Sequence, residues 1–257
     1  MIKAIIFDFD GTIAPTNLRQ YQWFQYWAKE NNKELLFKDY DPFMNFYNEE
    51  HNKKGIQSIY DVLELPCDMN DRNHPVHEAY EEFKANNPSG LYEGIESALH
   101  AIWEMGHLTG NIENNKRIRL AINSSNTWKS IKKDLEKYNL LQLFDCFVTE
   151  EVLRKHCHDG NLKKIQKPST KPLELILGFL GSNASETMHF GDTIYDLIAS
   201  RGIPGKNGGD LIAVGTAWGY EGEERLKVGA SINGKHLSFD EIIMAPKDCM
   251  EIVKKYL

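Results

Sequence analysis

The sequence has few of the features that mark secreted, membrane-bound or nucleic-acid-binding proteins. It holds four cysteines in 257 residues, with no C-x-x-C spacing, so we expect reduced thiols and no disulfide framework. It has no apolar run of membrane-spanning length and no signal-peptide pattern at its start, and we therefore expect a cytoplasmic protein without membrane contact. It carries 30 basic against 37 acidic residues, a net charge of -7, which argues against a nucleic-acid surface.

Zinc-site spacing is also missing. Two groups of potential ligands occur, His156-Cys157-His158-Asp159 and a looser set around His74 and His77 that includes Cys67 and Asp68. Neither group has the ligand spacing of a structural zinc site. We interpret both as solvated loops.

The strongest feature that is present lies at the start, in the run Lys3-Ala4-Ile5-Ile6-Phe7-Asp8-Phe9-Asp10-Gly11-Thr12. A continuous apolar run that ends at a glycine predicts a strand buried on both faces. Strand side chains alternate, which places Asp8 and Asp10 on one side. Two carboxylates at the end of a buried strand are costly unless a cation is bound, and such a carboxylate can also act as a nucleophile. An Asp-Gly turn would explain Asp10 and Gly11 but not Asp8.

The rest of the chain divides into two patterns. From about residue 17 to residue 87 it predicts consecutive helices, with a second helix starting at Asp41-Pro42 and aromatic residues at helical spacing that we expect to form a core. A breaker cluster at residues 86–90 follows. Beyond it, strands and helices alternate, with strands predicted at 118–122, 146–148, 188–190 and 211–214 and a helical tail at 239–257.

This alternation predicts an α/β domain with a parallel sheet and helices on both faces. An all-helical segment interrupts it. We expect residues 1–14 and 92–257 to form the core and residues 15–91 to form the inserted domain. Ligands bind at the carboxyl ends of the strands in such sheets, so the residues that follow each strand are the candidates for chemistry.

Polar residues follow two more of the predicted strands. The stretch Asn123-Ser124-Ser125-Asn126 suits a phosphate at a helix N-terminus, although plain capping by Ser125 or Asn126 explains it equally well. After the strand at 188–190 comes Gly191-Asp192-Thr193, and Thr193 with Asp196 fits a capping box. In the functional interpretation Asp192 joins Asp8 and Asp10 around a divalent cation, with Asp196 one turn further on. Oxygen ligands and a phosphorylated substrate favour Mg²⁺.

A lysine is needed near these acids and the phosphate. The run Leu162-Lys163-Lys164-Ile165-Gln166-Lys167-Pro168-Ser169-Thr170-Lys171-Pro172 offers several, most of which we expect to be solvated. We choose Lys167, with Lys171 as the alternative.

These four sites, in this order, resemble the motifs of the haloacid dehalogenase-like hydrolase superfamily, in its phosphatase and phosphomutase branch. Asp8-Phe9-Asp10-Gly11-Thr12 resembles the first motif, Ser124 the second, Lys167-Pro168 the third, and Gly191-Asp192 through Asp196 the fourth. The helical insert is similar to the family's cap of the first type (C1), and Leu91-Tyr92-Glu93-Gly94-Ile95 resembles the cap exit of phosphoglycolate phosphatase-like members. Longer connections at 107–116 and 206–209 depart from the family pattern.

The resemblance implies a Rossmann-like core with a helical cap and a phosphatase that hydrolyses a small phosphorylated metabolite. Asp8 would be the nucleophile that forms an aspartyl-phosphate, and Asp10 the general acid and base. Mg²⁺ would be held by Asp8, the backbone carbonyl of Asp10, Asp192 and Asp196. Ser124, the amide of Ser125 and Lys167 would bind the phosphate.

Other functions fit the same residues. A phosphomutase of the β-phosphoglucomutase type shares these motifs, and phosphonate cleavage would need a cap lysine such as Lys33, Lys38, Lys53 or Lys54. A phospho-acceptor signalling module and a catalytically silent binding protein are alternatives of a different class. The helical insert and Asp192 argue against the first, and the intact Asp8 and Asp10 pair argues against the second. The sequence leaves open whether the protein is a monomer or a dimer.

Overall fold

The computed structural model describes all residues except 70, 72, 110–116 and 206–209. The chain divides into two compact units. One consists of Met1–Ala14 with Leu91–Leu257, and the other of Pro15–Gly90. The connections expected to be long, at 107–116 and 206–209, fall largely on residues outside the description; helix α5 (Ile95–Thr109) extends into the first of them. Among the described residues there is no helix long and apolar enough to span a membrane.

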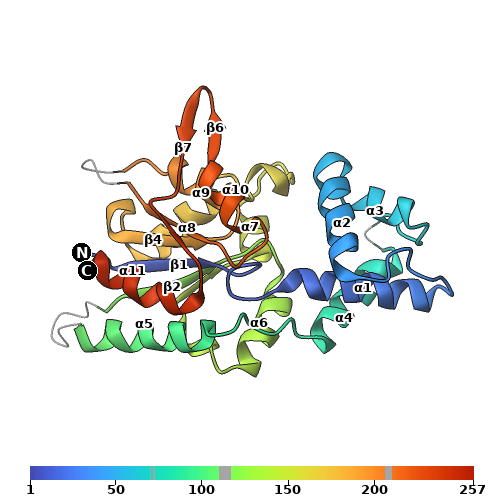
Figure 1. The fold of residues 1–257 in the computed structure, drawn as a ribbon, viewed down its shortest axis with the longest axis horizontal. Helices are drawn as coiled ribbons and strands as arrows, with labels where there is room; N and C mark the ends of the chain where they lie inside the picture. The colour runs from blue at the N-terminus through green and yellow to red at the C-terminus, as the bar shows by residue number, and fades with distance from the viewer. Residues whose placement is uncertain (70, 72, 110–116, 206–209) are drawn as a thin grey trace. The chain divides into compact units, whose positions relative to one another are not determined.

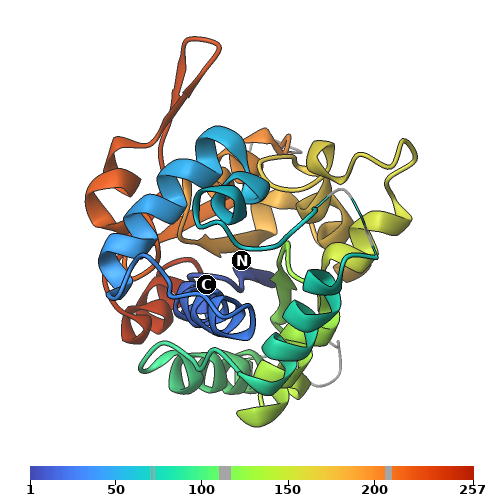
Figure 2. The ribbon, with the colours of Figure 1, turned by 90° about the vertical axis from the view of Figure 1, so that its right-hand side faces the viewer.

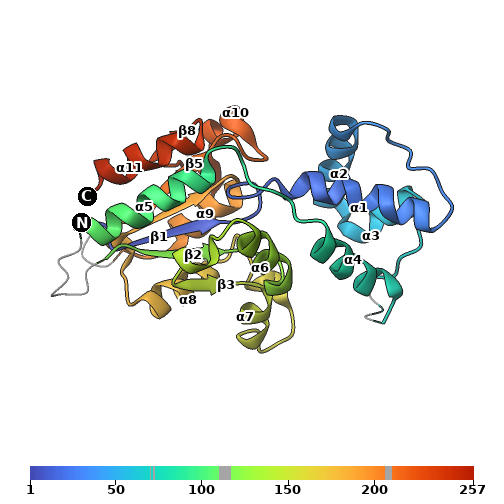
Figure 3. The ribbon, with the colours of Figure 1, turned by 90° about the horizontal axis from the view of Figure 1, so that it is seen from below.

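The first unit is built on a six-stranded sheet in the order β3-β2-β1-β4-β5-β8. Every neighbouring pair in it is parallel. The strands are β1 (Ala4–Asp8), β2 (Arg119–Asn123), β3 (Cys146–Val148), β4 (Thr187–Gly191), β5 (Ile212–Thr216) and β8 (Glu241–Ile243). Figure 1 labels β1, β2 and β4, and Figure 3 labels β3, β5 and β8. The predicted fold class, a Rossmann-like parallel sheet with a helical insert, is confirmed.

The alternating side chains of β1 supply two separate cores. Ile5 and Phe7 pack in a cluster with Leu99 of α5 and Val253 of α11 (Cys249–Lys255). Ala4 and Ile6 belong to the opposite cluster, which takes its helical residues from α7 (Glu150–Lys155), α8 (Lys171–Leu180) and α9 (Ile194–Gly202). Figure 3 shows α5 and α11 on one side of the sheet and α8 on the other. The burial of β1 on both faces explains its continuous apolar sequence.

The register of the sheet brings the carboxyl ends of the central strands to one level. Asp8 pairs with Asn123, and Phe7 pairs with Phe190. Gly191 pairs with Gly215 one position later. The loops that follow β1, β2, β4 and β5 therefore share one edge of the sheet, where open parallel sheets bind ligands.

The prediction of a helical tail at 239–257 is wrong in its first half. Residues 241–243 form β8, and α11 begins only at Cys249, after the 3-10 turn Pro246–Asp248. Asp240 fixes this strand against β5, because its amide donates to the Ala213 carbonyl at 2.9 Å while its carboxylate accepts from the Ala213 amide at 2.8 Å. Pro246 then prevents a continuous helix from forming across the segment.

A short antiparallel hairpin, β6 (Ala230–Ile232) and β7 (Lys235–Leu237), was not predicted. It follows α10 (Gly222–Val228) and projects from the unit in Figure 1. Its two-residue turn is Asn233-Gly234, and both residues have positive φ, 51° and 78°. Asn-Gly is the preferred pair for this turn, so the hairpin could have been predicted from the sequence.

The second unit consists of the helices α1 (Thr16–Glu30), α2 (Tyr40–Lys54), α3 (Ile56–Val62) and α4 (Pro75–Asn86), seen from another side in Figure 2. Trp23, Phe24 and Trp27 are buried in its core, and the Trp23 indole donates to the Tyr60 hydroxyl at 2.8 Å. The aromatic residues of α1 therefore serve mainly as core. Helix α2 begins at Tyr40, one residue before the start at Asp41-Pro42 that the sequence predicted.

Candidate active site

Three buried carboxylates meet at the carboxyl edge of the sheet. Asp8 is the last residue of β1, Asp192 follows β4, and Asp196 lies in the first turn of α9. One oxygen of each lies within 4.8 Å of the others, and each residue is at most 3% exposed. The structure thus brings together three of the residues proposed from the sequence to hold a metal.

Asp196 completes the capping box of α9 and also faces the carboxylate cluster. Its Oδ2 accepts a hydrogen bond from the Thr193 hydroxyl at 2.6 Å and completes the predicted capping box of α9. Its Oδ1 faces the cluster and accepts from Lys167 Nζ at 2.9 Å. The cap therefore fixes the rotamer that presents Oδ1 to the site.

Lys167 is the cation at this cluster, and Lys171 is not. Lys167 Nζ lies 2.5 Å from Asp8 Oδ1 and 2.9 Å from Asp196 Oδ1. Burial lowers the pKa of Lys167, but the two carboxylates outweigh this effect and hold the pKa above its ordinary value, so the amine stays charged. The Lys171 side chain is 39% exposed, and its ion-pair partner is Glu174, at 4.0 Å.

The cluster carries more negative charge than Lys167 balances. Burial, with repulsion from Asp196, raises the pKa of Asp192 to about 7. Burial and the other two carboxylates likewise raise the pKa of Asp8 well above its usual range, although Lys167 opposes this. Asp196 alone has its pKa lowered, because Lys167 overcomes the effect of burial. Three oxygen donors with one lysine fit a hard divalent cation such as Mg²⁺.

Asp10 lies in the turn after β1, apart from the three clustered carboxylates. Gly11 follows it with φ of 86°, a conformation that favours glycine. Ser124 Oγ donates to Asp10 Oδ2 at 2.8 Å, and Asn126 Nδ2 donates to Asp10 Oδ1 at 2.7 Å. The Asp10 carboxylate is therefore oriented by the loop after β2.

That loop contradicts one of its two interpretations from the sequence, helix capping, while phosphate binding stays a prediction. The N-cap of α6 (Trp128–Lys137) is Thr127, so capping by Ser125 or Asn126 is wrong. Ser124 is buried beside Asp10, and Ser125 is exposed. Asn126 was not proposed as a site residue. The sequence feature that could have identified Asn126 is its position two residues after Ser124, from which its side-chain amide can reach the end of the neighbouring strand β1.

The loop after β5 also contributes, and the sequence analysis missed it. The Tyr220 amide donates to Asp192 Oδ2 at 2.8 Å. Gly219 is required beside it, because a Cβ there would lie 2.2 Å from Asp192 Cβ and 2.6 Å from the Gly11 carbonyl oxygen. This loop could have been proposed from the sequence, because it follows a predicted strand and therefore lies at the edge of the sheet where ligands bind.

A buried histidine lies behind the carboxylates. His189 of β4 is 1% exposed, its Nδ1 lies 2.8 Å from Ser200 Oγ, and its Nε2 lies 3.8 Å from Asp196 Oδ1. Burial lowers the pKa of His189 to about 4, so its ring is neutral near pH 7. Lys167 consequently remains the cation that faces Asp196.

No second cluster of metal-ligating side chains occurs in the part of the chain that the structure describes. Cys157 contacts Asp159 within an exposed loop, and His77 Nε2 lies 3.1 Å from the Asp71 carbonyl. The two histidine and cysteine groups are therefore not assembled as metal sites.

Comparison with known proteins identifies the family. Residues 5–204 match the model of the haloacid dehalogenase-like hydrolases. The chain belongs to this family. The resemblance inferred from the motifs is confirmed, and so is the expected enzyme class, a phosphatase of this family.

The relatives extend over nearly the whole chain. Pyrophosphatase PpaX of Halalkalibacterium halodurans is 23% identical over 241 residues, 88% of each chain. Among solved structures, a predicted phosphoglycolate phosphatase from Haemophilus somnus is similar with a TM-score of 0.67, at 17% identity and covering 98% of each chain. A variant of CbbY from Rhodobacter sphaeroides in complex with xylulose-(1,5)bisphosphate has a TM-score of 0.63, at 18% identity, covering 96% of this chain and 95% of that chain. These structural likenesses show the fold.

Proposed function

We propose that the protein is a Mg²⁺-dependent phosphatase that hydrolyses a small phosphorylated metabolite through an aspartyl-phosphate on Asp8. The observation that carries this proposal is the position of Asp8, at the end of the central strand and against Lys167, Asp192 and Asp196. Asp10, held by Ser124 and Asn126, supplies a second carboxylate at the same strand end.

The chemistry divides between the two aspartates. An Asp8 oxygen attacks phosphorus, forming a new O–P bond while the bond to the leaving oxygen breaks. Asp10 gives its proton to that leaving oxygen, which departs as the alcohol. In the second step Asp10 takes a proton from water, the resulting hydroxide attacks phosphorus, and Asp8 is released together with inorganic phosphate.

The remaining residues neutralise and position charge. Lys167, the Ser124 hydroxyl and the Ser125 amide would bind phosphate oxygens, because phosphoryl transfer depends mainly on positioning and charge neutralisation. The carboxylates of Asp8, Asp192 and Asp196, with the backbone carbonyl of Asp10, would hold Mg²⁺. The metal supplies, when bound, positive charge that offsets the charge of the phosphoryl group.

We further propose that the helical unit Pro15–Gly90 acts as a cap that selects the substrate and excludes water. For the substrate, the relatives named pyrophosphatase make inorganic pyrophosphate the first candidate, and this rests on similarity along 88% of the chain. A fold neighbour from Thermotoga maritima that is named as a putative β-phosphoglucomutase, with a TM-score of 0.66 at 17% identity, keeps a phosphomutase as the alternative.

The proposal is tested by measuring phosphate release. Purified protein with Mg²⁺ is expected to hydrolyse para-nitrophenyl phosphate and at least one member of a panel containing pyrophosphate, sugar phosphates and phosphoglycolate. A phosphomutase would instead convert a sugar phosphate to its isomer with little free phosphate. If none of these compounds released phosphate, the result would contradict the phosphatase proposal.

Metal binding is expected to stabilise the protein in a pH-dependent way. The pKa values of Asp8 and Asp192 are raised, so without metal their ionisation costs stability as the pH rises toward and through about 7. Mg²⁺ needs the ionised forms, so 10 mM Mg²⁺ should raise Tm more at pH 7.5 than at pH 5.5. Calorimetry at both pH values measures this, with Asp192→Asn as the variant expected to lose the shift. Equal shifts at both pH values would disagree with the assignment.

A further inference from the structure

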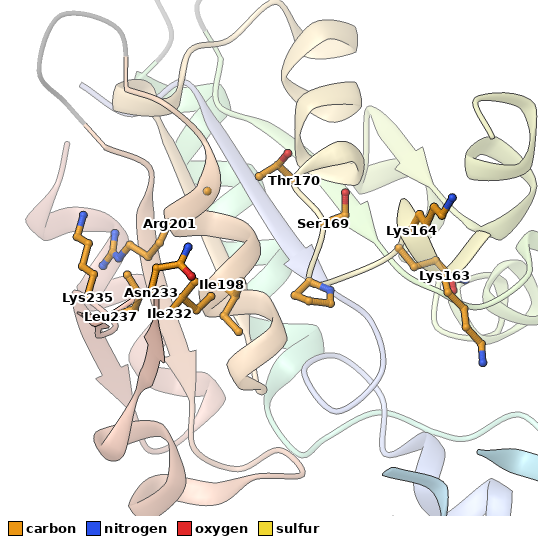
Figure 4. A pocket seen from close by; sticks show the side chains of 13 residues that line it. Lys163, Lys164, Ser169, Thr170, Ile198, Arg201, Ile232, Asn233, Lys235 and Leu237 are labelled. Carbon is orange, nitrogen blue, oxygen red and sulfur yellow. The ribbon is translucent and has the colours of Figure 1, made fainter. Parts of the chain in front are cut away.

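The open groove drawn in Figure 4 lacks the converging polar groups of a ligand site. It lies between the segment 163–170, helix α9 and the β6–β7 hairpin, and its volume is about 740 Å³. Lys163 and Lys235 come from opposite sides of it and point away from each other (Figure 4). Polar contacts do converge elsewhere in the core unit, at the loop after β5.

The loop after β5, residues 217–221, reaches the turn that follows β1. Trp218 Nε1 in this loop donates a hydrogen bond to the Thr12 carbonyl oxygen at 3.0 Å. The indole packs against the hydrophobic core on the α5 side of the sheet, which fixes the direction of that bond. The Thr12 hydroxyl lies 3.2 Å from the hydroxyl of Thr216, the last residue of β5. The turn that carries Asp10 is therefore attached to β5 and its loop as well as to its own strand.

The same loop also reaches the start of α9. Glu221 Oε2 accepts a hydrogen bond from the Ile194 amide at 2.8 Å. Ile194 is the first residue of α9 and lies midway between Asp192 and Asp196 in the chain. Its amide is one of the first-turn N–H groups that have no partner within the helix, and a carboxylate is the favourable group at that position. Glu221 therefore fixes the segment from which both aspartates project.

Asp192 lies where these two attachments meet. Its Oδ2 accepts from the Tyr220 amide at 2.8 Å, and its Oδ1 accepts from the Thr12 hydroxyl at 3.5 Å. The turn and this carboxylate are in close contact, because a Cβ on Gly11 would lie 2.1 Å from Asp192 Oδ2. A shift of the turn or of the loop would therefore move the Asp192 carboxylate.

The clustered carboxylates need to be held in place when they are ionised. Asp8, Asp192 and Asp196 offer oxygens within 4.8 Å of one another, so their charges repel, and Lys167 balances only part of that charge. They come from two segments, the end of β1 and the start of α9, and the loop after β5 is bonded to both. Removing partners that orient metal ligands in this way commonly lowers metal affinity by about 10–100-fold.

We propose that Trp218 and Glu221 are positioning residues for the Mg²⁺ site. Trp218 acts through the turn that carries the Asp10 carbonyl, and Glu221 acts through the segment between Asp192 and Asp196. Together they keep the oxygen donors of the two segments in a fixed arrangement, which matters because Mg²⁺ demands near-octahedral coordination. This rests on one part of the proposed function, the assignment of Mg²⁺ to these carboxylates.

Metal binding is tested by thermal unfolding of the whole protein at pH 7.5 over a series of Mg²⁺ concentrations, without substrate. The dissociation constant for Mg²⁺ follows from the rise in Tm with concentration. Trp218→Phe keeps an aromatic ring and removes the donor, and Glu221→Ala removes the acceptor. Each is expected to raise the dissociation constant by about tenfold or more. Glu221→Gln keeps an acceptor oxygen, so its dissociation constant should be closer to that of the wild type than to that of Glu221→Ala.

Each variant has a matched control. Trp103→Phe makes the same change in α5, where the Trp103 ring packs against the same hydrophobic core. Glu224→Ala removes a carboxylate of α10 whose side chain is 92% exposed. Neither control should change the dissociation constant for Mg²⁺. An unchanged constant for Trp218→Phe or Glu221→Ala, even with a lower Tm of the metal-free protein, would show a purely structural role and overturn the assignment of that residue.

Phosphatase assays with para-nitrophenyl phosphate give an independent readout. In Trp218→Phe and Glu221→Ala the Mg²⁺ concentration for half-maximal rate is expected to rise by about tenfold or more. The KM for the substrate and the kcat at saturating Mg²⁺ should change little. A fall in kcat that saturating Mg²⁺ does not restore would place the effect on the nucleophile and contradict the proposal.

The outcomes separate this proposal from the proposed function. If Mg²⁺ does not raise the Tm of the wild type, the metal assignment is wrong and the positioning role falls with it. If Mg²⁺ raises the Tm of the wild type and of both variants at the same concentrations, only the positioning role is wrong. If no compound is hydrolysed, the unfolding series still decides whether Trp218 and Glu221 set the affinity for Mg²⁺.

Discussion

Asp8→Asn is expected to lower kcat for phosphate release by about 10⁴-fold or more, the size of effect seen when a nucleophile is removed. The amide has the shape of the carboxylate but cannot attack phosphorus. It should not unfold the protein, because Asp8 is buried beside two other carboxylates that raise its pKa. Removing that charge relieves repulsion, so the metal-free variant should have a Tm at least equal to that of the wild type near pH 7.

The matched control is Asp10→Asn, which keeps the nucleophile. With an aryl phosphate, whose leaving group needs little help from an acid, Asp8 should still attack phosphorus in this variant. Hydrolysis of the phosphorylated intermediate should slow, because no base at position 10 takes the proton from water. Intact-mass measurement is expected to detect a covalent phosphate on Asp10→Asn and none on Asp8→Asn. Substantial turnover by a folded Asp8→Asn protein would rule out Asp8 as the nucleophile.

The sequence predicted the core of this fold because its strands are buried on both faces. In β1 each of the five residues is buried, so the apolar run was continuous and its end at Asp8 was clear. The same logic located Asp192 at the end of β4. The capping box of Thr193 and Asp196 was readable as well, because it depends only on local spacing.

The parts that were missed depend on contacts distant in the chain or on short elements. The strand β8 has three residues, and its pairing depends on Asp240 contacting Ala213, 27 residues earlier. Asn126 and Gly219 acquire their places at the site only when the sheet aligns the loops after β2 and β5 beside Asp10 and Asp192. The sequence analysis chose Lys167 but kept Lys171 as the alternative, because both precede proline in a lysine-rich run, and only the contacts of Lys167 with Asp8 and Asp196 separate the two.

We expect Lys167→Ala to lower the stability of the fold as strongly as it lowers catalysis. Lys171→Ala should change both very little. Lys167 Nζ is the cation at both Asp8 and Asp196, and its side chain is only 12% exposed. Removing one member of a buried ion pair commonly costs about 3–5 kcal/mol, and we expect a loss of that order in the free energy of unfolding at pH 7. Loss of a charge that stabilises the transition state adds a fall in kcat of about 10²–10³-fold.

The pH dependence of that loss separates the charge effect from simple loss of packing. Lys167 lowers the pKa of Asp196, so in the wild type Asp196 contributes stability that is present above its unfolded pKa and is lost as the pH falls through its folded value. In Lys167→Ala this contribution disappears, and both Asp196 and Asp8 become easier to protonate. The difference in unfolding free energy between variant and wild type should therefore be larger at pH 7 than at pH 4.5. Denaturant titrations of Lys167→Ala, Lys171→Ala and Lys167→Met at both pH values measure it. A difference that does not change with pH would show that the side chain of Lys167 acts through packing alone and that its charge does not hold the carboxylates together.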